Sequence, residues 1–540
     1  MVFKSIRLFF LLAFTAITSY SQQARPKLVV GLVVDQMRWD YLYRYQSLYA
    51  ADGFKRLMGQ GFSCENTFIP YIPTYTAIGH SCVYTGSVPA ISGIVGNNWF
   101  DKSIGRNVYC TDDSSVQSVG TSTIEGKMSP QNLWVTSITD ELRLSNNFKS
   151  KVIGIALKDR GAILPAGHSA NAAYWYDDSV GRWITSSYYM KTLPVWAENF
   201  NGKKSPASYM HNGWNTFLPP AKYEQSTADS VVYESRLPGE SSVSFPHRLP
   251  ATGRQQFEAF KYTPFAATYT FDFAKAAIEN ENLGNNAETD FLAISISSTD
   301  YTGHIFGPNS VEIEDTYLRL DNDIASFLQY LDTRLGKGNY TVFLTADHGV
   351  AHIPAFLKSH KIPAGTINEW DLRKEINDMI ERKTGIANVV MDMQNYQLYI
   401  NYRAIEAQQK DPVIIQQLIR DYLEEKPFVL SVFNMQDASQ ATLPEPIKSR
   451  VINSYNTKRS GDIQFIIKPN YFDGGASGTT HGSWNPYDSH IPLLWYGWGI
   501  KAGKTNRETY MTDIAATLAA ILKIQMPNGC VGKVITEVLK

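Results

Sequence analysis

Two pairs of acidic and imidazole side chains stand out in the sequence because their types and spacing suit metal binding. Asp347 and His348 are adjacent and follow an apolar run. Asp300 and His304 are separated by three residues and follow another apolar run. Carboxylate oxygens and imidazole nitrogens are ligands that suit Zn²⁺. The two pairs therefore indicate metal chemistry.

Two further residues complete a set of six. Asp35 comes directly after the apolar run 28–34, and His481 lies in a loop flanked by Gly478 and Gly482. Three aspartates and three histidines are enough for two sites with three protein ligands each. Three protein ligands leave a position open for water or substrate, as catalytic zinc sites require. We therefore expect two zinc ions per chain.

Thr76 is the candidate nucleophile. Pro73 and polar residues lead into the apolar helical segment 77–84, which places Thr76 near a helix N-terminus. Backbone N–H groups and the helix dipole at such an end favour a bound phosphate. A threonine hydroxyl becomes a nucleophile when a base or a metal removes its proton. The alternative role for Thr76 is that of a simple helix cap.

The apolar runs that precede these residues have the composition of strands buried on both faces, as in parallel sheets. Ligands gather beyond the carboxyl ends of such strands. Strands that alternate with helices predict an α/β fold with a mostly parallel central sheet and helices on both faces. The expected strands are 28–34, 151–157, 291–296, 340–344 and 491–496, and a closing helix is expected at 513–521.

Two stretches depart from this alternation. Residues from about 161 to 290 are rich in Tyr, Trp, Ser, Asn and Pro and are interpreted as a long insertion of ordered loops. Residues from about 351 to 470 are interpreted as a small α+β insertion. Within it, Asp371 is expected to cap one helix, and Asp411 precedes a second helix with Pro412 at its first position.

The N-terminus has the pattern of a secretory signal peptide over residues 1–21. Lys4 and Arg7 precede an apolar run of residues 8–17, and small and polar residues follow up to Ser21. A retained membrane anchor is the alternative. Cleavage would leave a mature chain of residues 22–540, which we expect to be a soluble monomer in the periplasm or the medium.

Composition excludes some partners. The formal net charge of −1 gives no basic face for nucleic acid, and after the signal segment no apolar run is long enough to span a bilayer. Four cysteines permit two disulfides in an oxidising compartment, with three possible pairings among which the sequence does not choose. They are Cys64, Cys82, Cys110 and Cys530.

Taken together, these residues resemble the motifs of the alkaline phosphatase superfamily. The resemblance implies one catalytic domain over residues 22–540 and two zinc ions about 4 Å apart that clamp an in-line phosphoryl displacement. It implies that the two metal sites have different roles. Asp35, Asp347 and His348 would hold the zinc that activates Thr76, and Thr76 would also bind this zinc. Asp300, His304 and His481 would hold the second zinc, which faces the leaving group.

Asn97, Lys158 and Arg160 identify the branch of the superfamily. With Thr76 they resemble the phosphate contacts of the PafA-type bacterial alkaline phosphatases. A lysine and a forked arginine can pair with the extra charged oxygen of a phosphate monoester. The resemblance therefore implies hydrolysis of small phosphate monoesters to inorganic phosphate through a covalent phosphothreonine.

Other interpretations remain open. Lys158 and Arg160 can instead be two solvated basic residues on a turn, and the enzyme would then be a phosphodiesterase or nucleotide pyrophosphatase of the same superfamily. A catalytically inactive metal-bound binding protein would need a broken ligand set, and here all six ligand positions are filled. The sulfatase branch requires a Cys or Ser with a nearby Arg, and neither stands at the position of Thr76.

Overall fold

A ten-stranded sheet forms the centre of the molecule in the computed structural model, which describes residues 25–250 and 252–540. The predicted signal peptide, residues 1–21, lies outside the described residues. In spatial order the strands are β20 (Gly503–Thr505), β2 (Phe62–Cys64), β19 (Leu493–Gly497), β11 (Tyr340–Thr345), β1 (Leu28–Val34), β10 (Asp290–Ile296), β7 (Val152–Ala156), β8 (Ala172–Asp177), β9 (Arg182–Ser186) and β6 (Ser118–Val119).

The five middle strands, from β11 to β8, are parallel to one another. Every residue of β1, β10, β11 and β7 is buried, as expected for parallel strands covered on both faces. The predicted α/β class and its central sheet are thus confirmed. The strand predicted at 491–496 is also present, as β19, but it runs antiparallel to β11.

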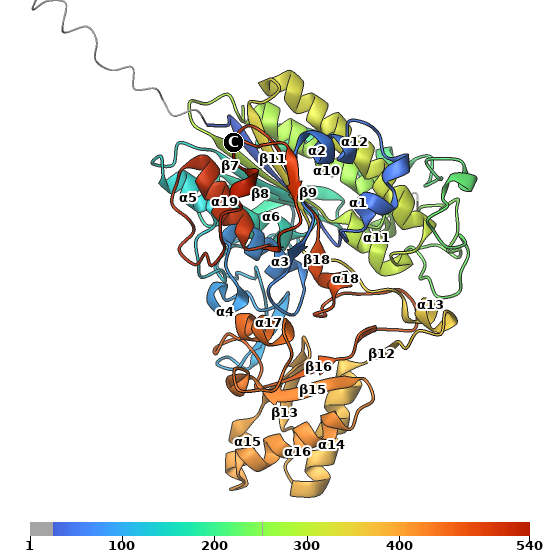
Figure 1. The fold of residues 1–540 in the computed structure, drawn as a ribbon, viewed down its shortest axis with the longest axis vertical. Coiled ribbons are helices and arrows are strands. Elements are labelled where there is room, and N and C mark those ends of the chain that lie inside the picture. Colours follow the sequence, from blue (N-terminus) through green and yellow to red (C-terminus); the bar gives the residue numbers. More distant parts are fainter. Residues whose placement is uncertain (1–24, 251) are drawn as a thin grey trace, which may run out of the picture.

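Helices cover the sheet in two groups (Figure 1). One group packs α10 (Phe265–Asn280) and α2 (Phe54–Gln60) against α12 (Val311–Leu335). The other packs α3 (Thr76–Thr85), α5 (Ile138–Leu144), α6 (Asp159–Ala166) and α19 (Asp513–Leu522) together. The start of α5 is fixed by a capping box between Ser137 and Asp140, and α3 ends at Gly86 in the left-handed conformation.

The prediction of long loops over 161–290 is wrong for much of that stretch. It contains β8 and β9 of the central sheet, α7 (Val195–Lys203), α9 (Arg254–Lys261) and the sixteen-residue helix α10. Many of the Tyr and Trp residues that suggested loops are core side chains here. Trp183 stacks on Tyr269 and Phe273 of α10 with ring centroids 5.3 and 4.5 Å apart.

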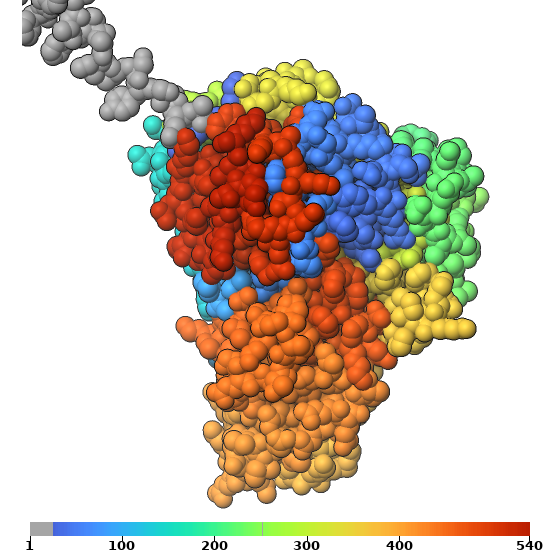
Figure 2. Space-filling view, in the orientation of Figure 1, coloured from blue at the N-terminus to red at the C-terminus, as the bar shows by residue number. Residues whose placement is uncertain are grey.

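Residues of the second insertion form a separate lobe, which projects from the main body in orange (Figures 1 and 2). Helices α14 (Glu369–Thr384) and α16 (Pro412–Glu424) pack on a four-stranded sheet of β13 (Val390–Gln394), β14 (Gln397–Ile400), β16 (Ile463–Ile467) and β15 (Val429–Asn434). α16 begins at Pro412 as predicted, and the side chain of Asp411 caps it. The cap of α14 is Asn368, whose side chain accepts from the Asp371 N–H.

The four cysteines carry free thiols, and Cys64, Cys82 and Cys110 are buried. Among the described residues, no helix has both the length and the apolar character needed to cross a membrane.

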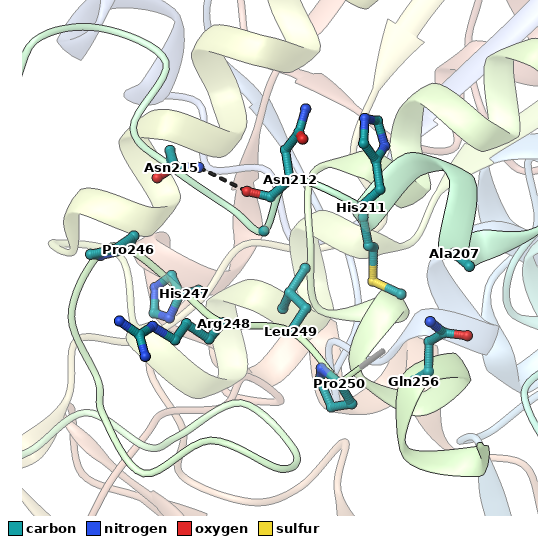
Figure 3. Close-up of a pocket in the computed structure, with 12 residues that line it drawn as sticks. Ala207, His211, Asn212, Asn215, Pro246, His247, Arg248, Leu249, Pro250 and Gln256 are labelled. Atoms are coloured by element: carbon teal, nitrogen blue, oxygen red, sulfur yellow. Dashed lines mark hydrogen bonds between the residues drawn. The ribbon is translucent and has the colours of Figure 1, made fainter. Parts of the chain in front are cut away.

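A cavity of about 580 Å³ lies in the segment that precedes α9, and His247 lines it (Figure 3). The His247 ring is buried between two carboxylates, with Nδ1 2.8 Å from Glu240 and Nε2 3.2 Å from Glu312. Burial alone would lower the pKa of His247, but the hydrogen bonds to both glutamates raise it to about 9. His247 therefore acts as a buried imidazolium that holds this segment to α12.

We expect this charge to make stability depend on pH. The pKa of His247 is about 9 in the folded protein and about 6.5 in the unfolded chain. The protonated ring therefore stabilises the fold fully below pH 6.5, and this stabilisation is lost as the pH rises through about 9. The loss should be on the order of 3 kcal/mol in urea unfolding, and His247→Gln should lack this part of it. Glu234, whose pKa burial raises to about 9, contributes in the same direction and cancels in the comparison. An unchanged pH dependence in the variant would contradict this assignment.

Candidate metal centre and active site

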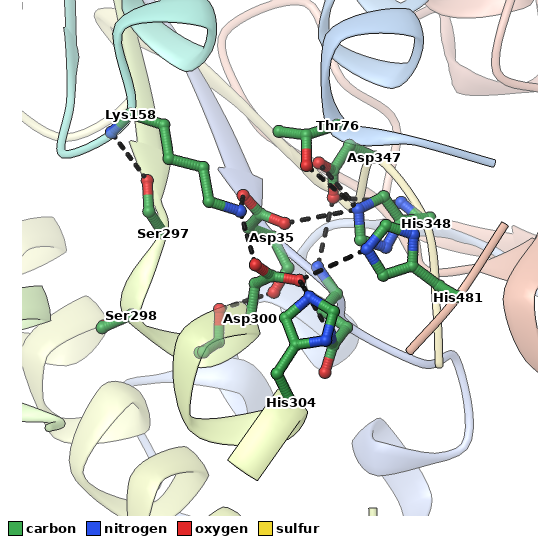
Figure 4. Close-up of polar contacts among 12 residues, drawn as sticks. Asp35, Thr76, Lys158, Ser297, Ser298, Asp300, His304, Asp347, His348 and His481 are labelled. Carbon is green, nitrogen blue, oxygen red and sulfur yellow. Dashed lines mark hydrogen bonds and ion pairs between the residues drawn. The ribbon is translucent and has the colours of Figure 1, made fainter. Parts of the chain in front are cut away.

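The strand order brings the predicted metal ligands together at one edge of the sheet (Figure 4). Asp35 follows β1, and β1 lies between β10 and β11. Asp300 lies on α11 (Ser298–Phe306) directly after β10, and Asp347 and His348 follow β11. The Asp35 N–H donates to Ile296 O at 3.1 Å, so the ends of β1 and β10 are held side by side. Parallel strands with adjacent carboxyl ends therefore assemble the site.

Among the described residues there are two groups of three potential metal ligands. Within each group the three ligand atoms lie within 4.8 Å of one another. One contains Asp300, His304 and His481, as predicted. The other joins Asp35 and His348 to Asp300 rather than to Asp347. Asp347 nevertheless lies close, because its Oδ2 is 3.4 Å from His348 Nε2. The six predicted ligands thus form one cluster in which Asp300 is central.

The three histidines present the same nitrogen to this cluster. Each Nδ1 donates to a backbone carbonyl: His304 to Thr479 at 2.8 Å, His348 to Gly349 at 3.0 Å and His481 to Thr74 at 2.6 Å. A carbonyl only accepts, so the Nε2 lone pair of each ring faces the carboxylates. Fixing the tautomer through the other ring nitrogen is typical of metal-binding histidines.

Donor chemistry shows that the cluster fits a cation. The Nε2 of His348 is 3.5 Å from Asp35 Oδ1 and 3.4 Å from Asp347 Oδ2. Within the described part of the chain, Asp35 Oδ1 is buried and lacks a hydrogen-bond donor. Asp347 Oδ2 is also buried, and apart from His348 its polar neighbour is His80 Nδ1 at 3.2 Å. Burial lowers the pKa of His348, which favours the neutral ring. Lone pairs that converge in this way are stable when a metal ion lies among them.

Lys158 supplies positive charge inside the same cluster. Its ammonium is 2.7 Å from Asp35 Oδ2 and 2.5 Å from Asp300 Oδ2, and all three side chains are buried. Burial and the nearby Asp347 raise the pKa of Asp35. Burial also acts to raise the pKa of Asp300, but His304 and Lys158 hold it well below its usual value. Lys158 therefore binds at the acidic centre of the site.

Thr76 is the first residue of α3, and Tyr75 occupies the cap position before it. Thr76 is thus not the helix cap. Its Oγ1 lies 3.4 Å from His348 Nε2, which places the hydroxyl at the ligand cluster. The predicted nucleophile and the predicted metal ligands therefore meet at the N-terminus of a helix, where the dipole favours anions.

Asn97 and Arg160 lie next to this helix start. Asn97 Oδ1 accepts a hydrogen bond from the Ala77 N–H at 2.9 Å. This contact identifies Oδ1 as the acceptor, so Nδ2 is the donor group of the amide. Arg160 is the second residue of α6 and donates from Nη1 to the Tyr109 hydroxyl at 2.9 Å. Both predicted phosphate contacts are hydrogen-bonded to neighbouring groups.

Gln36, which no sequence pattern indicated, also contacts the candidate ligands. Its Nε2 donates to Asp300 Oδ1 at 2.6 Å, and its N–H donates to Asp347 Oδ1 at 3.1 Å. Its backbone has φ of 67°, an uncommon conformation for a residue other than glycine. The one available signal was its position directly after Asp35. Gln36 orients two of the carboxylates at the site.

A parallel sheet with aspartate and histidine ligands at its strand ends, and a threonine at a helix start beside them, defines the class: this is the arrangement of the alkaline phosphatase superfamily. A model of the type I phosphodiesterase / nucleotide pyrophosphatase family matches residues 29–488. The matched stretch includes all six predicted ligands and Thr76.

Individual relatives match over nearly their whole length. The alkaline phosphatase PafA of Elizabethkingia meningoseptica is 51% identical, over 95% of each chain. The alkaline phosphatase PhoV of Synechococcus elongatus is 51% identical, over 96% of this chain and 94% of its own. A Myroides odoratus protein named calcium-transporting ATPase is 54% identical, over 97% of each.

A crystal structure of wild-type PafA superposes with a TM-score of 0.93 at 50% identity, covering 96% of this chain and 99% of that one. A PafA variant substituted at a threonine, an asparagine, a lysine and an arginine superposes equally well. The chain belongs to the type I phosphodiesterase / nucleotide pyrophosphatase family of the alkaline phosphatase superfamily, and within it is close to PafA.

We predict that protein stripped with a chelator takes up two equivalents of Zn²⁺ per chain, measured by elemental analysis after dialysis. His481→Ala should retain about one equivalent, because the site around Asp35 and His348 keeps its ligands. His360→Ala, which removes an exposed histidine, should still bind two. Uptake of one equivalent or none by the unmodified chain would contradict a two-metal site.

Proposed function

We propose that the protein is a metal-dependent alkaline phosphatase that hydrolyses phosphate monoesters with Thr76 as nucleophile. The observation that carries the proposal is the position of Thr76 at the start of α3, within 3.4 Å of a metal-type ligand and next to Asn97. The PafA variant supports the proposal. The spacing between its substituted threonine and asparagine equals that between Thr76 and Asn97 here, and the spacing between its substituted lysine and arginine equals that between Lys158 and Arg160.

Two zinc ions fit the mixed nitrogen and oxygen donors. Asp35, Asp347 and His348 would hold one, Asp300, His304 and His481 the other, and Thr76 would bind the first through its hydroxyl. Their chemistry would be to lower the pKa of the Thr76 hydroxyl and to balance the charge of the transferred phosphoryl group. Because Asp300 lies within 4.8 Å of ligands in both groups, it is placed to influence both sites.

The protein groups orient the phosphoryl group in this scheme. Backbone N–H groups at the start of α3, the Asn97 amide, Lys158 and Arg160 supply donors to its oxygens. Thr76 Oγ1 forms a bond to phosphorus as the bond to the leaving oxygen breaks, which gives a phosphothreonine. Water then attacks that phosphorus, releasing inorganic phosphate and restoring the threonine.

A phosphodiesterase or nucleotide pyrophosphatase is the second candidate, since the family model carries that description. Lys158 and Arg160 favour the monoesterase. A monoester has one more charged oxygen than a diester, and a lysine together with a forked arginine would balance that charge. We also propose that the enzyme is exported, because its N-terminus has the pattern of a signal peptide. We propose further that it acts as a monomer on small substrates.

The substrate preference tests this choice. Lys158→Ala combined with Arg160→Ala should lower kcat/KM for p-nitrophenyl phosphate by roughly a hundredfold to ten-thousandfold, because two charge-assisted hydrogen bonds of about 1.5–3 kcal/mol each are removed. Hydrolysis of bis-p-nitrophenyl phosphate should fall much less, because one of its oxygens is esterified.

Two controls accompany this experiment. Zinc content must be measured in the double variant, because Lys158 also binds Asp35 and Asp300. Lys203→Ala with Lys204→Ala, a remote basic pair on the surface, should leave both activities unchanged. Equal losses on the monoester and the diester would count against the monoesterase and for general binding by the pair.

A further inference from the structure

Arg160 is held by a hydrogen-bonded network that none of its predicted roles explains. We propose that Tyr109 and Asp159 are positioning residues, which fix the guanidinium of Arg160 in the orientation that binds the monoester phosphate. This inference rests on the proposed function, because it assigns a role to residues that act through Arg160. Its elements are a tyrosine hydroxyl, a carboxylate and a threonine.

The Tyr109 hydroxyl lies between the two charged residues. It donates to Asp159 Oδ1 at 2.7 Å and accepts from Arg160 Nη1 at 2.9 Å. The second oxygen of Asp159 accepts from the Thr111 hydroxyl. Asp159 and Arg160 are the first two residues of α6, whereas Tyr109 and Thr111 lie about fifty residues earlier in the chain.

The chemistry of the three groups fixes the direction of each hydrogen bond. A carboxylate only accepts and a guanidinium only donates, so the hydroxyl proton must point to Asp159 and a hydroxyl lone pair to Arg160. Burial raises the pKa of Tyr109 well above its usual range, so the hydroxyl keeps this proton in alkaline solution. The network therefore gives Arg160 Nη1 an acceptor whose own orientation is fixed.

Arg160 is not held by a carboxylate directly. Among the described residues, no Asp or Glu oxygen lies within 4.0 Å of its guanidinium, and its Nε is buried without an acceptor. A direct ion pair would neutralise the arginine and compete with phosphate. Contact through a hydroxyl orients the side chain and leaves its charge available for a ligand.

A β-hairpin that includes Tyr109 connects Arg160 to Asn97. Tyr109 ends β5 (Arg106–Tyr109), which pairs with β4 (Asn98–Asp101) so that Tyr109 is opposite Asn98. The Cys110 N–H donates to Asn97 O at 2.9 Å and closes the base of the hairpin. One hairpin thus contacts both Asn97 and Arg160, the two proposed phosphate contacts that come from distant parts of the chain.

A double-mutant cycle tests the proposal. Tyr109→Phe keeps the ring and removes the hydroxyl, and it should lower kcat/KM for p-nitrophenyl phosphate by about tenfold while changing bis-p-nitrophenyl phosphate hydrolysis little. In the Arg160→Ala background the same change should have almost no further effect. Asp159→Ala should resemble Tyr109→Phe, because the hydroxyl then loses its fixed direction.

Tyr269→Phe is the matched control, since its buried hydroxyl has no hydrogen-bond partner in the described part of the chain. It should retain full activity, and all variants should unfold at similar temperatures. If Arg160→Ala loses monoesterase activity and Tyr109→Phe does not, or if their losses multiply, the positioning role is overturned and the proposed function stands. If Arg160→Ala itself loses nothing, the role of Arg160 in the proposed function falls as well.

Discussion

Burial of several like charges at one edge of the sheet is the constraint on which the rest of the site depends. Asp35, Asp300 and Asp347 are each almost completely shielded from water. An uncompensated buried carboxylate costs several kcal/mol, so three together require cations and donors. Lys158 supplies one charge, and Gln36 and backbone N–H groups supply donors. The remaining carboxylate and imidazole lone pairs are what a pair of metal ions would satisfy.

This constraint explains features far from the strands. Helix α11, the loop after β11 and the loop before α18 (Pro486–Ser489) each provide a histidine whose ring is held by a backbone carbonyl. The carbonyls that hold His304 and His481 belong to other loops, at Thr479 and Thr74, so these loops must pack against the site. The orange lobe contributes too, since the side chain of Asn395 donates to Asn98 O at the hairpin that carries Asn97. The lobe therefore supports the hairpin next to Asn97.

The sequence predicted those parts of the structure that depend on short-range patterns. Continuous apolar runs located the buried strands, and polar residues directly after them located the ligands, because parallel strands end at one edge. It could not predict contacts between distant segments, such as the hydrogen bond from Arg160 to Tyr109. The sequence also did not predict β8 and β9, because their aromatic and polar residues have the composition of loops. These aromatic residues are buried through contacts with α10, which lies far away in the sequence. Asp300 as a residue common to both ligand groups likewise depends on how the strand ends meet.

The central claim is that the buried charges serve covalent phosphoryl transfer to Thr76. Rapid acid quenching during turnover of p-nitrophenyl phosphate, followed by mass spectrometry of the peptides, tests it most directly. The account predicts a single phosphoryl group on Thr76 in the zinc-loaded enzyme and none on Thr76→Ala, which should keep its fold and its metal. Steady turnover with no phosphorylated Thr76 at any quench time, or with the phosphoryl group on another residue, would contradict it.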